Sequence, residues 1–257
     1  MKLYFRFFAI HIKSELAYPG SFLLNCLGRV LYFASILLGC LLVTDRFGAV
    51  GGHSLDEILL CFGVILSAYS LAECFARGFD RFSAIVREGK FDRLLARPRG
   101  LVFQVICQDL RLSALGNVLL GLGMLAWAIL RGNIPWTLGK ALTLAAMVLC
   151  GALLFFGVFL IYATLCFFTL EGLEILNIFT DGVKEHGRYP FDVYGKGVLW
   201  FLTALLPFAL VQYWPLEYLM GRGPGWYGLL PLVSLWFLLP CYALWRFGVR
   251  KYKSSGS

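Results

Sequence analysis

The chain has 257 residues, of which 60% are hydrophobic and only 15% are charged, and its mean hydropathy is +0.76. Soluble domains carry about 25% charged residues, so one water-soluble core could not bury this much apolar surface. The net charge of +8 does not indicate a nucleic-acid partner, because the basic residues lie in short segments between apolar runs, where membrane topology places them. The sequence therefore predicts an all-α integral membrane protein whose partners include membrane lipid and exclude nucleic acid.

The first twenty residues combine basic and apolar side chains in a pattern typical of a helix that lies in the membrane interface. On a helical projection, Lys2, Arg6 and Lys13 fall within an arc of about 40°, beside a mainly apolar face. The alternative is an ordinary basic flank to the first span. Because Pro19-Gly20 then interrupts the helix, we expect an interfacial helix over 1–20.

Six apolar segments follow, and most of them reach the roughly 20 residues that a helix needs to cross the hydrocarbon core. Together they predict a single transmembrane domain over 1–257 with six transmembrane helices. The expected spans are 22–43, 58–75, 112–130, 141–170, 197–216 and 223–245. The second of these is the shortest.

Three residues within the spans are candidates for a translocation pathway or gate: Arg29, Pro207 and Pro215. A charge within a span often marks a functional path, although Arg29 could equally reach the headgroups by snorkelling. The two prolines predict kinks in the fifth span, which suit a moving gate and also occur in static helices. Glu73 and Arg77 are spaced to pair as i,i+4 neighbours near the membrane boundary, which favours a structural role for them.

The distribution of Lys and Arg predicts the orientation of the spans. If the N-terminus is cytoplasmic, the segments on the cytoplasmic side carry 17 Lys and Arg residues and those on the other side carry four. Positive residues concentrate on the cytoplasmic side of a membrane. We therefore expect a multi-pass protein of the cytoplasmic (inner) membrane with both termini in the cytoplasm, which agrees with an even number of spans.

The longest polar connection, 76–100, predicts a short cytoplasmic helix that contacts a partner. Gly89 permits a sharp turn before this helix, and Pro98 limits it before the third span begins. Exposed apolar residues in a charged segment suit a partner surface. The apolar residues in question are Phe91, Leu94 and Leu95. The alternative is a plain connector whose basic residues only follow the positive-inside rule.

No motif in the chain indicates catalysis or nucleotide binding. None of the three Gly-Lys pairs is followed by Ser or Thr, so the phosphate-binding loop is absent, and neither GxSxG nor HExxH occurs. The three histidines lie far apart, and the eight cysteines contain no CxxC pair, which argues against a metal or redox site. We expect no catalytic, cofactor-binding or metal-binding residue in this chain.

The stretch REGKFDRLLARPR, from Arg87 to Arg99, resembles the cytoplasmic loop of the ABC-2 type transporter permeases. That loop has the pattern Gly-x-Phe/Leu-Asp-x-Leu-Leu-x-Arg-Pro. The matching residues here are Gly89, Phe91, Asp92, Leu94, Leu95, Arg97 and Pro98. Tyr189-Pro190 before the fifth span and the basic tail after Trp245 also resemble that family, so the resemblance extends over essentially the whole chain.

The resemblance implies the six-span membrane subunit of an ABC exporter. Such a permease pairs with a second permease chain, identical or homologous, and with two separate ATPase subunits. The ATPase subunits bind ATP and Mg, and the permease itself binds no cofactor. The 76–100 loop would supply the coupling helix, with its apolar residues in a groove of the ATPase. Arginines at the rim of this contact would orient the helix on the ATPase by electrostatic attraction. These are Arg93, Arg97 and Arg99.

Two other classes of function remain open from the residues alone. One is an ion-coupled secondary transporter, and the other is a non-transporting membrane scaffold or enzyme. Co-purification with an ATPase, or an ATPase reading frame beside the gene, would distinguish the ABC permease from both.

Overall fold

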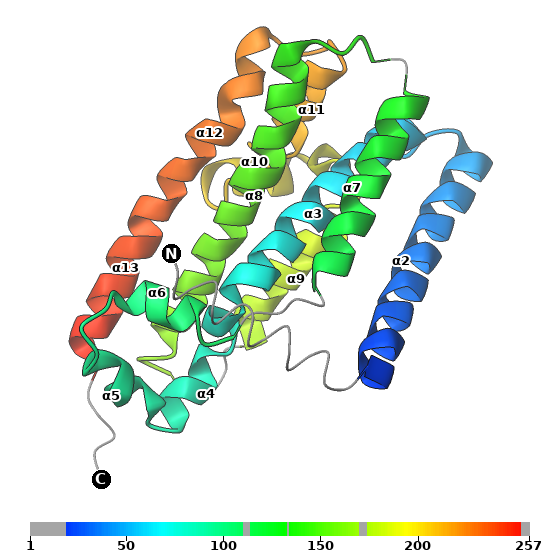
Figure 1. Ribbon diagram of the computed structural model, residues 1–257. Helices are drawn as coiled ribbons and strands as arrows, with labels where there is room; N and C mark the ends of the chain where they lie inside the picture. The colour runs from blue at the N-terminus through cyan, green and yellow to red at the C-terminus, as the bar shows by residue number, and fades with distance from the viewer. Residues whose placement is uncertain (1–18, 110–113, 133, 170–173, 253–257) are drawn as a thin grey trace.

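The protein is a bundle of helices whose long axes run in roughly the same direction (Figure 1). The computed structural model describes residues 19–109, 114–132, 134–169 and 174–252. The predicted interfacial helix at 1–20 lies almost entirely outside these ranges. The regular elements within them are helices, which confirms the predicted all-α membrane fold.

Within the described residues, five helices are long and apolar enough to cross a membrane. Four are single α-helices, and the fifth combines η2 (Gly225–Leu229), α12 (Leu230–Ser234), η3 (Leu235–Phe237) and α13 (Leu238–Lys251). The single ones are α2 (Pro19–Phe47), α3 (Leu55–Asp80), α7 (Ala114–Arg131) and α8 (Leu138–Leu165). Each coincides with a predicted span, although α8 ends five residues before the predicted boundary at 170.

Helix α3 forms the centre of the bundle, and 89% of its most apolar window is buried inside the protein, against 12% for α2 at the periphery. Small residues allow the neighbouring helices to approach α3 closely. A Cβ atom added at Gly121 of α7 would lie 2.3 Å from the Ser67 hydroxyl oxygen, and one at Gly151 of α8 would lie 2.9 Å from the Ala68 Cβ. Between membrane helices such close packing replaces the hydrophobic driving force that operates in water.

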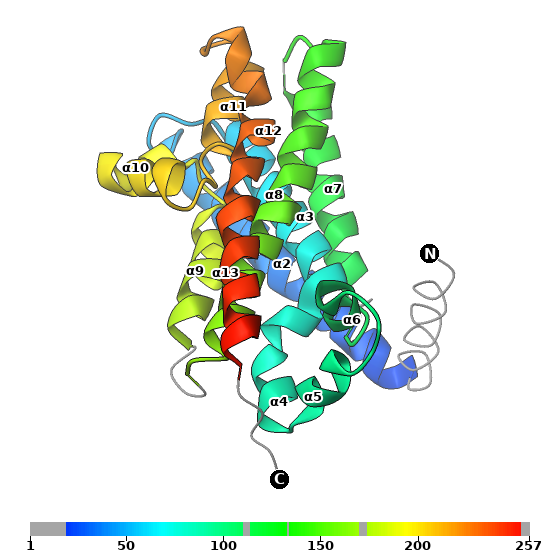
Figure 2. The ribbon, with the colours of Figure 1, turned by 90° about the vertical axis from the view of Figure 1, so that its left-hand side faces the viewer.

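The predicted fifth span, 197–216, is not one continuous helix. After α9 (Glu174–His186) come η1 (Phe191–Tyr194), α10 (Lys196–Ala204) and α11 (Tyr213–Leu219), and Figure 2 shows α10 lying across the direction of the bundle. We call residues 174–219 the broken segment. Pro207 has no N–H to donate and disfavours a helical residue before it, so α10 cannot continue through this position.

Figures 1 and 2 show that the broken segment leads from one end of the bundle to the other. Pro215 lies in the first turn of α11, where a missing N–H is tolerated. The N–H of Ala209 reaches back to the Leu202 carbonyl oxygen at 2.8 Å, and Trp214 Nε1 donates to the Thr203 hydroxyl at 3.3 Å. The break is therefore held together by specific bonds, while the number of membrane crossings stays a prediction.

Gln212 is the main polar support of this break. Its side chain is fully buried, and Nε2 donates to the carbonyl oxygens of Gly187 at 2.9 Å and Tyr189 at 2.8 Å. Its Oε1 accepts from the N–H of Phe191 at 3.2 Å. Backbone groups at membrane depth need a protein partner when no helix provides one, and this one side chain satisfies three of them.

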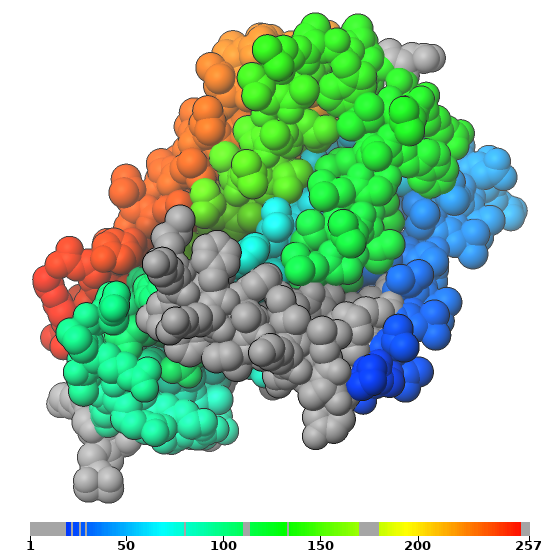
Figure 3. All heavy atoms as spheres, viewed as in Figure 1, coloured from blue at the N-terminus to red at the C-terminus, as the bar shows by residue number. Residues whose placement is uncertain are grey.

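Three short helices project from one end of the bundle: α4 (Phe82–Arg87), α5 (Lys90–Leu95) and α6 (Leu101–Ile106). We call them the helical layer. Figure 3 shows the layer, in teal, at the lower end of the molecule. The first described residue, Pro19, and the end of α13 lie at this same end (Figure 1).

Replacing Gln212 with leucine should destabilise the fold, because it leaves two carbonyls and one N–H without partners in the interior. Each buried polar group left unsatisfied costs about 1–3 kcal/mol, so we expect the free energy of unfolding to fall by at least about 2 kcal/mol. Thermal unfolding in detergent measures the effect. Gln108→Leu, at an exposed position, is the matched control; equal losses from both variants would contradict the role assigned to Gln212.

Candidate functional site

The helical layer contains the residues predicted to couple the chain to a partner. Gly89 connects α4 to α5 with a φ of 65°, in the left-handed region that glycine adopts without strain. Gln104 of α6 donates from Nε2 to the carbonyl oxygens of Leu94 at 3.1 Å and Arg99 at 2.8 Å. The turn that contains Pro98 is therefore held against α6, and the layer has a defined shape.

Phe91 and Leu94 face the interior, which corrects the expectation that both would be presented to a partner. Phe91 is fully buried and Leu94 is 2% exposed. The ring centroid of Phe91 lies 5.2 Å from that of Phe82 and 4.9 Å from that of Tyr252. The sequence pattern identified apolar side chains that need a partner, but it could not tell whether that partner was another protein or the rest of the same chain.

Phe91 belongs to an aromatic cluster that joins the helical layer to the bundle. Neighbouring ring centroids in the cluster lie 4.9 to 5.6 Å apart, and most pairs are edge-to-face. Its members are Phe79 of α3, Phe82 of α4, Phe91 of α5, Phe167 after α8, Trp245 of α13 and Tyr252. Aromatic pairs contribute about 0.5–1.5 kcal/mol beyond the area they bury. The cluster thus connects the layer to the ends of α3, α8 and α13.

The outer surface of the layer is smaller than the sequence suggested and mainly basic. Leu95 is the one exposed member of the predicted apolar trio, at 43%. Asp92 lies in the first turn of α5, where a carboxylate interacts favourably with the helix dipole. The exposed residues around Leu95 are Arg93, Arg97, Pro98 and Arg99. We call Leu95 and these four residues the basic face.

At the opposite end of the bundle lies an ionic cluster that the sequence analysis did not find. His53 Nδ1 is 2.6 Å from a carboxylate oxygen of Glu57, and its Nε2 is 2.9 Å from Asp192. Arg222 forms two bonds to Glu57, at 2.7 and 3.2 Å, and a further bond to Glu217 at 2.7 Å. These five residues come from three separate parts of the chain, 53–57, 192 and 217–222, so only the short spacings within 53–57 and 217–222 could have indicated the cluster.

The two carboxylate neighbours of His53 favour its imidazolium form. The residue is 5% exposed, and both ring nitrogens face carboxylate oxygens, to which both can donate only in the imidazolium form. Burial lowers the pKa of His53, but the hydrogen bonds to Asp192 and Glu57 outweigh burial and raise the pKa above its usual value. The remaining charged groups of the cluster, Arg222 and Glu217, add one charge of each sign.

The ionic cluster fastens the broken segment to the central helix. Asp192 lies on η1 and Glu217 on α11, at either side of α10, whereas Glu57 lies in the first turn of α3. Pro207 and Pro215 are buried between these attachment points. Arg29, the third candidate for a pathway or gate, lies within α2, and its side chain is outside the described part of the structure.

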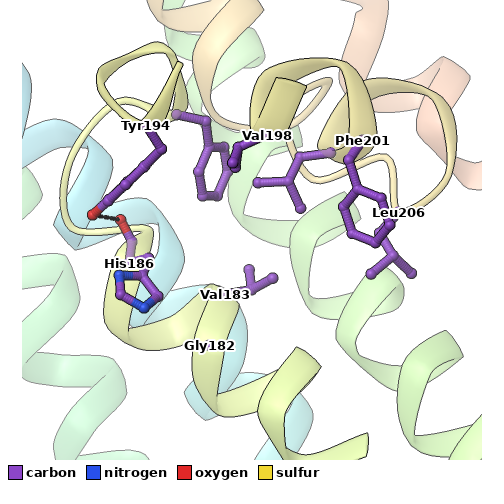
Figure 4. Close-up of a pocket in the computed structure, with 9 residues that line it drawn as sticks. Gly182, Val183, His186, Tyr194, Val198, Phe201 and Leu206 are labelled. Carbon is purple, nitrogen blue, oxygen red and sulfur yellow. Dashed lines mark hydrogen bonds between the residues drawn. The ribbon is translucent and has the colours of Figure 1, made fainter. Parts of the chain in front are cut away.

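A groove opens beside the broken segment, between α9 and α10 (Figure 4). It has a volume of about 290 Å³ and is lined almost entirely by apolar side chains such as Val183, Phe201 and Leu206. At its edge, the Tyr194 hydroxyl donates to the carbonyl oxygen of His186 at 2.8 Å. The groove suits an apolar molecule or an acyl chain and offers little that could bind a nucleotide.

A smaller polar cavity of about 170 Å³ lies among α2, α3, α7 and α9. Its polar lining includes Glu73 and Asn117, each 5% exposed, and Lys184, whose Nζ lies 5.0 Å from the Tyr69 ring centroid. The Glu73 carboxylate is 3.7 Å from Arg77, which confirms the predicted pair. Ionisable groups in the interior of a membrane bundle are often functional, so this cavity also belongs to the candidate site.

Comparison with protein families identifies the chain. A family model described as an ABC-2 family transporter protein matches residues 30–256, which include the helical layer, the broken segment and the ionic cluster. This match confirms the resemblance that the 87–99 stretch indicated. No curated protein and no solved structure shows a significant match to the chain.

The two apolar roles on α5 can be separated by stability measurements. Phe91→Ala removes a fully buried ring and should lower the free energy of unfolding by about 3–5 kcal/mol. Leu95→Ala, at an exposed position, should change it by less than about 1 kcal/mol. Thermal unfolding in detergent, with limited proteolysis of the layer, tests this difference. A fully stable Phe91→Ala variant would show that the aromatic cluster does not hold the layer in place.

The stability contributed by His53 should depend on pH. A histidine whose pKa is raised by folding stabilises the protein fully below its unfolded value of about 6.5, and this contribution is lost as the pH rises through the raised folded value. We therefore expect the difference in melting temperature between wild type and His53→Gln to be largest at acidic pH and to shrink above neutrality. His186→Gln, which removes an imidazole without a carboxylate partner in the described chain, is the control. A difference that grows with pH would refute the ionic assignment.

Proposed function

The chain belongs to the ABC-2 family of transporter proteins and is a membrane permease of ABC-type transport, and we propose that it serves an ATP-driven exporter by coupling to a separate ATPase. The observation that carries the proposal is the family match over residues 30–256 together with the basic face at the end of the bundle. ABC-type transport needs a surface that receives the mechanical work of an ATPase. The basic face provides an exposed apolar side chain, Leu95, together with three exposed arginines.

ATP and Mg would bind to the partner and not to this chain. The sequence contains no phosphate-binding loop. The grooves and cavities described above are apolar or small, which also argues against a nucleotide site. Two ATPase subunits would lie against the helical layers of two permease chains, so the layer would face the cytoplasm, together with both termini.

Coupling would pass from the basic face inward through Phe91. Leu95 would contact a groove of the ATPase, with Arg97 at the rim, where a long-range electrostatic attraction orders the encounter. The aromatic cluster then connects the layer to α3, α8 and α13. A rigid connection of this kind converts a small movement at the surface into a shift of whole helices.

The broken segment is the element best suited to act as a gate. It consists of four short elements instead of one continuous helix, and it is attached to α3 through the ionic cluster. Loss of those ion pairs would weaken the attachment of η1 and α11 to α3 without disturbing the close packing among α3, α7 and α8. Pro207 and Pro215 fit this proposal because they prevent the segment from re-forming one long helix.

A second permease chain, identical or homologous, would complete the pathway. The peripheral helix α2 buries little of its surface within one chain, which leaves it available to lipid or to the second chain. Contacts between membrane helices rely on close packing of small and apolar side chains. The broken segment would then lie close to the centre of a twelve-span assembly.

Ion-coupled transport is the second candidate, and the polar cavity favours it. Glu73 and Lys184 are ionisable groups inside the bundle, as proton- or cation-coupled carriers require. Transport in proteoliposomes separates the two mechanisms. Export that needs the ATPase and ATP, and survives dissipation of ion gradients, supports the ABC permease; transport by the chain alone, driven by a gradient, would replace it.

Substitutions on the basic face should weaken ATPase binding without unfolding the permease. Truncating an interface anchor costs about 2 kcal/mol, so Leu95→Ala should raise the dissociation constant for the ATPase about thirtyfold. Arg97→Ala should have a milder effect, because charges at an interface rim contribute less. Co-purification and transport-coupled ATP hydrolysis measure both variants.

Arg46→Ala, in the last turn of α2 at the opposite end of the bundle, is the matched control for the loss of a charge. It should leave ATPase binding unchanged. If Leu95→Ala and Arg97→Ala both retain full binding and coupled turnover, the basic face is only a connector, and the ATPase contacts the permease elsewhere.

A further inference from the structure

A groove of about 370 Å³ lies between the start of α6 and the last turns of α13. Figure 3 shows these two segments in contact, with the teal layer directly below the red end of α13. One wall is formed by Gly100, Leu101 and Val102, and the other by residues of α13. The α13 residues are Tyr242, Trp245, Arg246, Val249 and Arg250. The groove is open to the outside of the bundle and is separate from the basic face of α5.

The groove combines two positive charges with an apolar floor. Arg246 and Arg250 are i,i+4 neighbours, so both guanidinium groups project from the same side of α13. Neither forms an ion pair with a carboxylate within the described chain. Trp245 is 2% exposed and belongs to the aromatic cluster, so it provides a rigid wall, while Val249 and Leu101 add apolar surface. Guanidinium groups are well suited to bidentate bonds with phosphate oxygens.

If the hydrocarbon core is centred on the last helix, the groove lies at the depth of lipid headgroups. The Gly225–Lys251 helix rises roughly 40 Å, which exceeds the hydrocarbon core of about 30 Å. If the core is centred on this helix, Arg246 falls near its edge and Arg250 falls beyond it. A basic pocket between helices at this level fits the headgroup of an anionic lipid, while its apolar part can accept the start of an acyl chain.

We infer that this groove is a binding site for an anionic phospholipid, whose phosphate is held by Arg246 and Arg250 and whose acyl chain lies against Tyr242 and Val249. A competing occupant from the chain itself is the N-terminal stretch 1–18. That stretch carries Lys2, Arg6 and Lys13 and no acidic residue before Glu15, so its charge opposes that of the two arginines. Charge complementarity therefore favours the lipid.

Native mass spectrometry of the full chain, with added phosphatidylglycerol or phosphatidylcholine, tests this inference. The wild-type protein should retain phosphatidylglycerol in preference to phosphatidylcholine. Each arginine near an anionic lipid surface contributes a roughly equal share of the attraction. Removing both charges in R246Q/R250Q should therefore weaken phosphatidylglycerol binding about thirtyfold. Glycerol 3-phosphate should fail to displace the lipid, because it lacks the acyl chain; displacement by it would assign the site to soluble phosphates and overturn the inference.

Two further variants separate the groove from bulk charge. R87Q/R93Q removes the same charge from exposed positions of the helical layer and should leave phosphatidylglycerol retention unchanged. Gly100→Leu keeps both arginines but fills open space in the groove, and its φ of −57° tolerates a side chain; we expect severalfold weaker retention. Equal losses in both arginine pairs, or full retention in Gly100→Leu, would show that no defined site exists here. Deletion of residues 2–17 should preserve the preference, and its loss would assign the headgroup to that segment instead.

Discussion

Inside an apolar bundle every backbone N–H and carbonyl needs a protein partner, and the arrangement of this chain depends on how that need is met where a helix stops. Four long helices satisfy their own backbones. The broken segment does not, and Gln212 supplies the missing bonds to Gly187, Tyr189 and Phe191. One amide side chain therefore permits an irregular path inside the bundle. The groove beside α10 exists because the chain follows this path instead of forming one continuous helix.

The two ends of the bundle are stabilised by different physical interactions. At the end that carries the helical layer, edge-to-face aromatic rings join α3, α5 and α13, and such packing is insensitive to pH and salt. At the other end, His53 and Arg222 connect carboxylates from distant segments, and these contacts respond to protonation. This division would suit a permease that contacts an ATPase at one end and opens at the other. The aromatic cluster would form the rigid connection, and the ionic cluster would form contacts that can be released.

The family resemblance and the positions of most spans could be predicted because both rest on local patterns. Apolar length identified α2, α3, α7, α8 and the last span, and the 87–99 stretch indicated the family that the match over 30–256 confirms. The exposure of Phe91 and Leu94 was predicted wrongly. Their partners, Phe82, Phe167 and Tyr252, lie on other segments, and burial against a distant segment leaves no trace in the local sequence.

The sequence by itself determined that this chain belongs in a membrane, that its helices are long enough to cross it, and that it contains no phosphate-binding loop. It could do so because composition, apolar length and short motifs are properties of contiguous residues. Only the tertiary structure decided that 197–216 breaks into α10 and α11 and that five charged residues from three parts of the chain form one cluster. It also decided that Leu95 is exposed among arginines while Phe91 and Leu94 are buried. Each of these depends on which distant side chains meet, and that is fixed by the packing of whole helices around α3 and not by any local pattern.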